Sequence, residues 1–252
     1  MENSSGLTSY SPGKDLREGH IFLVNKPLGW TSFNVVGKVK YLLRHHLGYR
    51  KIKVGHAGTL DPLATGLMVV CVGRATKLAQ GLTAADKEYY ATFTLGASTP
   101  SYDGETAVDT THPTEHITEE LVRQVARGMV GEMLQVPPLF SAKRVDGQRA
   151  YDLARRGQEA ELAPVPIVIH EFELLSIRGL QVEARIRCSK GTYIRAIARD
   201  FGQALRSGAY LTALRRSRSG DFTLEGASTV AELEAFITAI APLYATKKQQ
   251  DQ

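Results

Sequence analysis

The sequence predicts a soluble α/β (α+β) protein, because strand-like and helix-like segments alternate along a chain of ordinary globular composition. Of its 252 residues, 43% are hydrophobic and 23% are charged, which excludes wholesale disorder, a collagen-like repeat and a coiled coil. Residues 167–177 and 181–188 are strand-like runs on either side of a turn at Arg178-Gly179, which predicts an antiparallel hairpin in the core sheet. Residues 192–206 carry apolar side chains at helical spacing, which predicts a helix.

The remaining elements follow in chain order from the same two patterns, strand-like runs and apolar residues at helical spacing. In the first part, a strand over 20–24 precedes turn residues 25–29, a helix is capped by Thr31 or Ser32, and a loop spans 55–62. Further along, we expect the following segments: a strand over 66–73, a short helix from Ala75, a strand over 87–95, a helix over 117–129, a polar and basic segment over 141–156, and a last helix over 230–240.

No internal repeat and no long linker divide these segments, so we expect one domain. Its predicted bounds are residues 19–240, after a flexible leader over 1–18 and before a polar tail over 241–252. The leader has no apolar core, so it is not a signal peptide, and no apolar run approaches the ~20 residues that span a bilayer. We therefore expect a cytoplasmic protein.

The positive charge is concentrated in one part of the chain. The net charge is +5, but residues 185–218 hold nine basic residues against one acid, whereas residues 100–135 hold seven acids against two basic residues. A basic face opposed to an acidic one indicates nucleic-acid docking on one side. A solvated face of mixed charge explains the count as well, and both interpretations stay open.

Cysteine and histidine provide no sign of a metal site. Cys71 and Cys188 are far apart and form no Cys-x-x-Cys pair, so we expect reduced core thiols rather than a disulfide or a zinc ribbon. His112 and His116 are four residues apart, but Pro113 lies between them and no Glu-x-x-His pattern accompanies them. The sequence therefore predicts no metal ligands.

The segment 55–66, with the sequence GHAGTLDPLATG, has the composition of a loop that contacts a ligand. It combines three glycines, a histidine and an aspartate between apolar elements, and glycine permits positive φ and the close approach of another backbone. A structural explanation is also open, since Asp61-Pro62 is a favourable helix start. No Gly-Lys-Ser/Thr follows the glycines, so the segment is not a phosphate-binding P-loop.

This segment resembles the active-site motif of the TruB family of tRNA pseudouridine synthases. Other blocks resemble that family in the same order, and together they cover roughly residues 20–220. They are Asn25-Lys26-Pro27, Asp86-Lys87-Glu88-Tyr89, Pro138-Leu139-Phe140-Ser141-Ala142-Lys143 and Cys188-Ser189-Lys190-Gly191-Thr192-Tyr193-Ile194-Arg195. The resemblance implies the pseudouridine synthase catalytic fold: a central mixed, largely antiparallel sheet flanked by helices, with an RNA-clamping insertion over 141–160. Bacterial relatives commonly continue into a PUA-type RNA-binding domain, which we do not expect here.

The resemblance also implies the reaction and its residues. A T-loop uridine of tRNA (position 55) would be isomerised to pseudouridine without a cofactor, and Asp61 would attack the flipped nucleotide at the base or at the sugar C1′. Arg195 would pair with the aspartate, and Tyr89 would stack on the base and handle the C5 proton. Without the resemblance, the alternative explanations are a surface arginine for Arg195 and an ordinary strand aromatic for Tyr89.

Further residues are implied to bind the uridine and the RNA. His56 would help to open the T-loop, and Tyr193 with Leu214 would form walls of the base pocket. The remaining candidates are cationic: Lys26, Lys143, Arg144, Arg149, Lys190, Arg215 and Arg216. The expected partner is the T-arm of tRNA, bound by a monomer with no obligate protein partner. Two alternatives stay open: a tRNA-binding or RNA-folding protein without catalysis, and a pseudouridine synthase of different site specificity.

Overall fold

The computed structural model describes residues 15–141, 144–145, 148–149, 156 and 162–250. The chain forms two compact units: the first comprises Met1–Lys87 and Arg215–Gln252, and the second comprises Glu88–Leu214. The single domain that we expect over residues 19–240 contains parts of both units, and its bounds stay a prediction.

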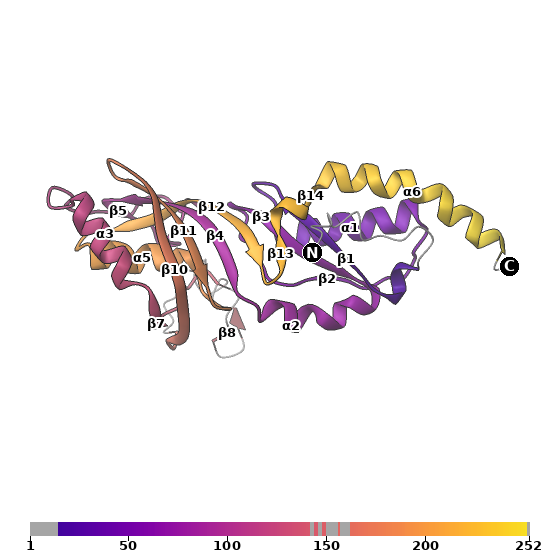
Figure 1. The fold of residues 1–252 in the computed structure, drawn as a ribbon, viewed down its shortest axis with the longest axis horizontal. Coiled ribbons are helices and arrows are strands. Elements are labelled where there is room, and N and C mark those ends of the chain that lie inside the picture. Colours follow the sequence, from indigo (N-terminus) through magenta and orange to yellow (C-terminus); the bar gives the residue numbers. More distant parts are fainter. Residues whose placement is uncertain (1–14, 142–143, 146–147, 150–155, 157–161, 251–252) are drawn as a thin grey trace. The chain divides into compact units, whose positions relative to one another are not determined.

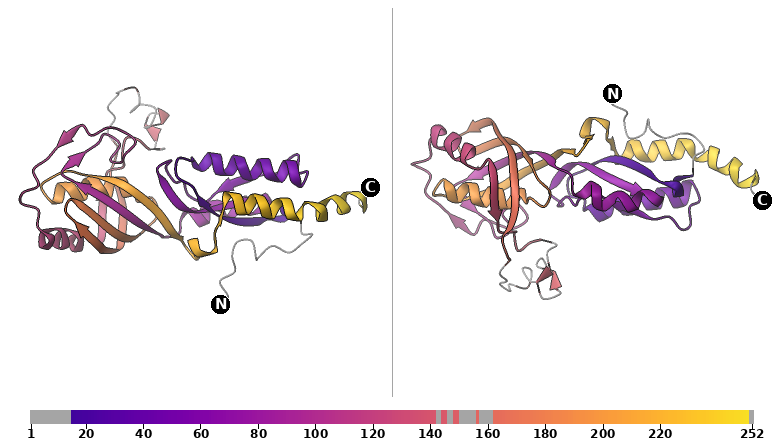
Figure 2. Two further views of the ribbon diagram at one scale, coloured as in Figure 1. Left: turned by 90° about the horizontal axis from the view of Figure 1, so that it is seen from above. Right: turned by 60° about the horizontal axis from the view of Figure 1, so that its bottom comes forward.

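The first unit is a small sheet with helices on both faces (Figures 1 and 2). Its strand order is β14-β1-β3-β12, with β2 paired to β3 and β13 to β12. Strand β1 runs antiparallel to β3 and parallel to β14, which makes the sheet mixed. Its elements are η1 (Leu16–Glu18), β1 (His20–Lys26), α1 (Ser32–His46), β2 (Val54–His56), β3 (Ala64–Val72), η2 (Gly73–Leu78), α2 (Ala79–Thr83), the end of β12 (Ala209–Ser219), β13 (Phe222–Thr223), η3 (Leu224–Gly226), β14 (Ser228–Thr229) and α6 (Val230–Gln250).

Strand alternation decides which side chains fill each face of this sheet. Leu23, Val69 and Cys71 form one buried cluster with Ala75 of η2, against which Ala79 of α2 packs. Phe22, Val24 and Val70 alternate with them and are also buried, so they point to the opposite face, where Figures 1 and 2 show α1 and α6 side by side. Both faces are covered, which explains why residues 66–73 read as a continuous apolar run.

The second unit is a sheet of strand order β12-β4-β11-β10-β7, in which β10 is antiparallel to both β11 and β7. Helix α3 packs against β10 and α5. Three aromatic rings fix α5 to the sheet, since Phe201 of α5 lies 5.7 Å from Phe93 and 5.5 Å from Phe172 between ring centroids. The elements are β4 (Lys87–Leu95), β5 (Ala97–Ser98), β6 (Thr110–Thr111), α3 (Glu119–Gly128), β7 (Gly131–Gln135), β8 (Arg144–Val145), β9 (Gln148–Arg149), β10 (Val165–Arg178), β11 (Gln181–Cys188) and α5 (Ile194–Ala204).

The structure confirms the mixed, largely antiparallel sheet flanked by helices. Leu16, within the predicted leader, is buried, and its backbone N–H donates to the Tyr49 hydroxyl at 3.0 Å. Helix α6 continues to Gln250 with Pro242 inside it, so residues 241–250 are helical rather than a tail. Among the described residues, no helix is long and apolar enough to cross a membrane.

Candidate active site

The loop that carries Asp61 connects two paired strands of the first unit. Strand β2 lies antiparallel to β3, with Gly55 opposite Cys71, and the backbone N–H of Ala57 extends this pairing by donating to Val69 O at 2.9 Å. After Asp61 the chain makes a turn, in which Ala64 N donates to Asp61 O at 3.1 Å, and it enters β3 directly. No helix begins at Asp61-Pro62, so the helix-cap explanation of this aspartate is wrong.

Lys26 ties this loop to the segment that precedes α1. Its side chain is fully buried, and its ammonium donates to the carbonyls of Pro27, Trp30 and Pro62. Burial lowers the pKa of Lys26 from its ordinary 10.5 to about 8, the Asp61 carboxylate opposes the shift, and the Arg216 charge adds to it. An ammonium with a pKa of about 8 is mostly charged at pH 7, so Lys26 supplies a buried positive charge near Asp61.

Arg216 holds the same loop from strand β12. Its side chain is 1% exposed, and the guanidinium donates to Leu67 O at 2.8 Å, Gly58 O at 3.1 Å and Thr59 O at 3.3 Å. Phosphate contacts are expected from the sequence for Arg216, and an RNA role for Lys26. Both expectations are corrected, because each cation is buried and bound to backbone carbonyls. The two residues position the loop.

Gly66 allows strand β12 to approach this loop. Its φ is +101°, and a Cβ atom on it would lie 2.3 Å from the backbone oxygen of Arg216. Gly29, by contrast, has a φ of +79° and open space around it. A side chain at either glycine would strain the backbone, but only a side chain at Gly66 would also clash with a neighbouring strand. Comparing the two positions therefore distinguishes the two costs.

We expect Gly66→Ala to lower the free energy of unfolding by ~3–5 kcal/mol, because strain and overpacking add. Gly29→Ala, the matched control, carries the strain alone and should cost ~1–2 kcal/mol. Urea unfolding of both variants measures the difference. Equal losses would show that the close approach to Arg216 is unimportant.

His56 ends β2 next to this loop and is half-buried. Burial lowers the pKa of His56, and the Arg216 charge lowers it further. The imidazole is therefore neutral at pH 7, a state that suits contact with a base better than contact with a phosphate.

The second unit holds the other two predicted catalytic residues, and both are buried. Tyr89 lies on the inward face of β4 and is 8% exposed, whereas its neighbour Tyr90 points outward. Arg195, in the first turn of α5, is 5% exposed. The explanation of Arg195 as a surface residue is therefore wrong.

Asp103 is a site residue that our sequence analysis missed. Its carboxylate lies 3.5 Å from the Arg195 guanidinium, and both side chains are 5% exposed. Arg195 also donates to Ser101 O at 3.1 Å and to Phe140 O at 2.8 Å. Between Ser101 and Asp103, Tyr102 adopts a φ of +59°, a strained conformation for a non-glycine residue that is common at functional sites. The only sequence signal was the acidic run over 100–135, which we interpreted as surface charge.

The turn that precedes α5 is fixed by a second missed residue, Gln135. Its side-chain amide is buried, accepts from Tyr193 N at 2.9 Å and donates to Tyr193 O at 3.2 Å. Tyr193 and Leu214 are half-buried, whereas Lys190 and Arg215 are exposed. Arg144 and Arg149 are register partners in the β8–β9 hairpin, and Lys143 lies outside the described residues.

Ion pairs within the protein account for much of the basic stretch over 185–218. Arg185 pairs with Glu88, Glu171 and Glu173. Arg187, Arg195 and Arg199 pair with Glu171, Asp103 and Asp200, respectively. The exposed cations of the stretch are Lys190, Arg206, Arg215 and Arg218. The basic face is thus smaller than the charge count implies.

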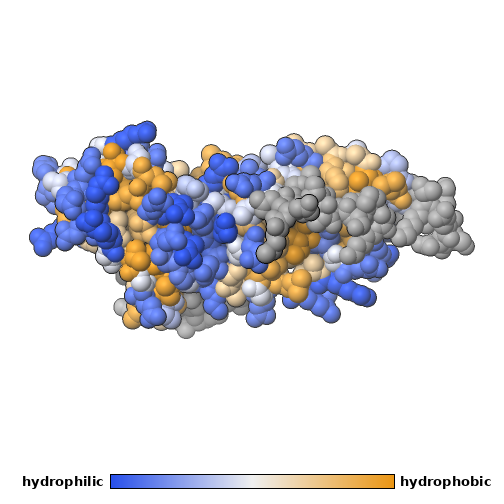
Figure 3. Space-filling model, in the orientation of Figure 1, coloured by the Kyte–Doolittle hydropathy of each residue, from blue (hydrophilic) through white to orange (hydrophobic). Residues whose placement is uncertain are grey.

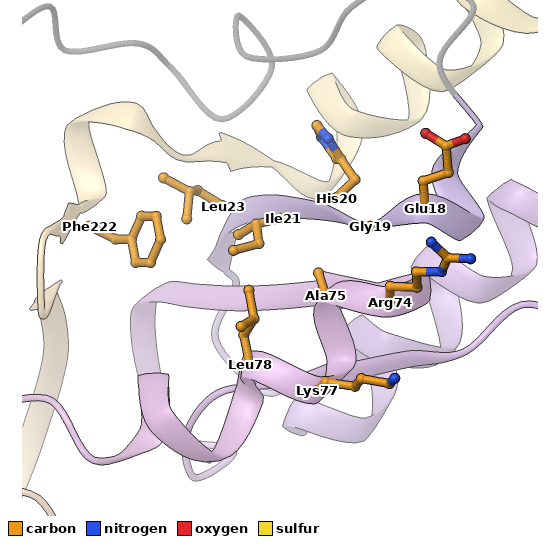
Figure 4. A pocket seen from close by; sticks show the side chains of 10 residues that line it. All are labelled: Glu18, Gly19, His20, Ile21, Leu23, Arg74, Ala75, Lys77, Leu78 and Phe222. Atoms are coloured by element: carbon orange, nitrogen blue, oxygen red, sulfur yellow. The ribbon is translucent and has the colours of Figure 1, made fainter.

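A pocket of ~640 Å³, whose lining includes no predicted catalytic residue, lies between β1, η2 and Phe222, with Ile21, Leu23 and Leu78 at its apolar end (Figure 4). Figure 3 shows apolar surface near α2 in the same unit. Within the described ranges, no cluster of three His, Cys, Asp or Glu side chains could hold a metal ion.

Comparison with known proteins identifies the class. The chain resembles a chain in the crystal structure of a Cbf5–Nop10–Gar1 complex, with a TM-score of 0.69 and 27% identity over 94% of this chain and 63% of that one. The fold is that of a pseudouridine synthase. Residues 44–194 match the model of the TruB family pseudouridylate synthase N-terminal domain, and residues 195–245 match the tRNA pseudouridylate synthase B C-terminal domain.

The chain belongs to the TruB family. It is 57% identical to the tRNA pseudouridine synthase B of Bacteroides fragilis over 211 residues, which are 84% of this chain and 91% of that protein. It is 46% identical to the protein of the same name from Mycobacteroides abscessus, over 86% of this chain and 73% of that protein.

Proposed function

We propose that this protein isomerises the T-loop uridine of tRNA to pseudouridine. The observation that carries the proposal is the Asp61 loop: the buried cations Lys26 and Arg216 hold it through hydrogen bonds to its carbonyls, and Asp61 does not begin a helix. Relatives that are named tRNA pseudouridine synthase B and match over most of the chain support the same activity.

The proposed reaction is balanced without a cofactor. The N1–C1′ bond of the uridine breaks, the uracil rotates, and a C5–C1′ bond forms. The C5 proton is lost and N1 gains a proton, so the product is an isomer of the substrate. Asp61 is the nucleophile that carries the detached fragment.

Tyr89 and Arg195 have supporting roles in this proposal. The buried phenol of Tyr89 stacks on the flipped base and exchanges the C5 proton. Arg195, which Asp103 and two carbonyls hold in one orientation, pairs with the Asp61 carboxylate. His56, Tyr193 and Leu214 contact the extruded nucleotides.

The test is tritium release from tRNA labelled at uridine C5. The wild-type protein should release one tritium for each pseudouridine formed, and mapping of the product should locate it in the T-loop. Absence of release by the wild type would favour a protein that binds RNA without catalysis. Modification elsewhere would favour a synthase of different specificity.

The β8–β9 hairpin is proposed to bind the RNA backbone, so Arg149→Ala should raise the KM for tRNA without lowering the single-turnover rate at saturation. Losing one phosphate contact should also reduce the slope of log affinity against log salt by ~1. Arg178→Ala, which changes an exposed arginine of the β10–β11 hairpin, is the control and should change neither value. A large fall in the saturated rate of Arg149→Ala would contradict this role.

A further inference from the structure

Large apolar side chains are exposed on the two segments that flank Asp61. Leu28 is 64% exposed, Phe33 is 79% exposed and Leu63 is 38% exposed, and Trp30 is half-buried. We call these four residues the apolar rim. All of them belong to the first unit, and none has a part in the reaction proposed above.

Hydrogen bonds join the two segments of the apolar rim into one element. Gly29 N donates to Pro62 O at 2.9 Å. The Ser32 hydroxyl accepts from Leu60 N at 2.8 Å and donates to Leu60 O at 2.9 Å. Leu28 precedes Gly29 and Leu63 follows Pro62, so both leucines adjoin this hydrogen bond. Phe33 follows Ser32, and Ser32 bonds Leu60, the residue before Asp61.

Phe33 contributes nothing visible to the stability of its own helix. Thr31 caps α1 in a complete capping box with Asn34, and the buried face of the helix consists of Ser32, Val35, Val39, Leu42 and Leu43. Phenylalanine is a weaker helix former than alanine or leucine, and its exposed ring remains in contact with water. Phe33 is therefore an exposed aromatic residue in a segment that is hydrogen-bonded to the Asp61 loop, and its ring is available for binding.

The surrounding charge favours a polyanion as the occupant. The first turn of α1 contains no acidic residue, so the positive end of the helix dipole is not neutralised there. Lys26 and Arg216 bind backbone carbonyls and do not contact phosphate, but their two charges add positive potential beside Asp61. Single-stranded RNA fits both an exposed aromatic ring and positive potential, because its unstacked bases stack on aromatic rings and its phosphates are attracted by positive charge.

We propose that the apolar rim binds a base of the substrate RNA that neighbours the target uridine, by stacking on Phe33. This inference rests on the proposed function, since it assigns the rim to the same RNA. Phe33 is then a binding residue for a flanking nucleotide and has no role in the chemical step.

The test compares Phe33→Ala, Phe33→Leu and Phe33→Tyr with the wild type on a T-arm hairpin RNA. Trp30 is the only tryptophan of the chain and belongs to the rim, so its fluorescence reports binding directly. Loss of one stacked base should raise the Kd about tenfold or more in the alanine and leucine variants. The tyrosine variant should bind within about twofold of the wild type, because it keeps the ring, and all three should keep the single-turnover rate at saturating RNA.

Tyr41→Ala is the matched control, because Tyr41 is an exposed aromatic residue on the same helix that stacks on His45. Its Kd should be unchanged. An unchanged Kd for Phe33→Ala, or equal binding by the leucine and tyrosine variants, would overturn the stacking proposal while the wild type still forms pseudouridine. If the wild type itself neither bound nor modified the RNA, the proposed function would fail with it.

Discussion

Asp61→Asn is expected to abolish pseudouridine formation while tRNA binding is retained. Asparagine has the same shape as aspartate but carries no negative charge, so it cannot attack the nucleotide. Removing a covalent nucleophile lowers the rate by ~10⁴-fold or more. The Asp61 side chain lies near buried positive charge, so losing its charge should not weaken the attraction for RNA.

Tritium release measures the reaction, and filter binding measures affinity. Asp221→Asn is the matched control, because it changes an exposed aspartate in the turn between β12 and β13 and should leave both values unchanged. Substantial release by Asp61→Asn would show that another group attacks the nucleotide. Loss of binding with the rate at saturation preserved would assign Asp61 to RNA recognition.

The second large effect is expected on stability. Arg216→Met keeps much of the side-chain length but removes the donors to three backbone carbonyls, the buried one of Leu67 and the part-buried ones of Gly58 and Thr59. Buried carbonyls without a donor cost ~1–3 kcal/mol each, and relaxation recovers part of this. We expect the free energy of unfolding to fall by ~3–5 kcal/mol, and activity to fall with it because the Asp61 loop loses its support.

Urea unfolding followed by circular dichroism measures this loss. Arg218→Met is the matched control: it is on the same strand, but the arginine is exposed, and its loss should cost under ~0.5 kcal/mol. A stable Arg216→Met protein that binds tRNA more weakly would restore the phosphate role expected from the sequence.

Local periodicity predicted most of the elements of the fold. The strand over 87–95 matches β4, and the predicted hairpin corresponds to β10 and β11, because their strand-like residues and turn are consecutive in the chain. Strand β12 was missed. Its eleven residues include three arginines, Arg215, Arg216 and Arg218, and they form a strand because β3 and β4 lie on either side of it.

The charge pattern shows where counting along the chain fails. Residues 185–218 carry a large positive excess, but Arg185 pairs with Glu88, which is 97 positions away. Asp103 and Arg195 are likewise distant in sequence, and a charged residue considered alone is expected at the surface. No count within a window detects such pairs.

The family follows from the sequence alone, because runs of consecutive residues carry the motifs that identify it. The roles of the residues around the loop depend on tertiary structure. From residue type alone, Lys26 and Arg216 are expected to bind RNA. In the structure, Arg216 instead donates to a carbonyl 149 positions away in the sequence, and Lys26 donates to one that is 36 positions away. Folding buries these cations, and a buried cation must bind the acceptors that surround it, because leaving it unpaired away from water costs too much free energy.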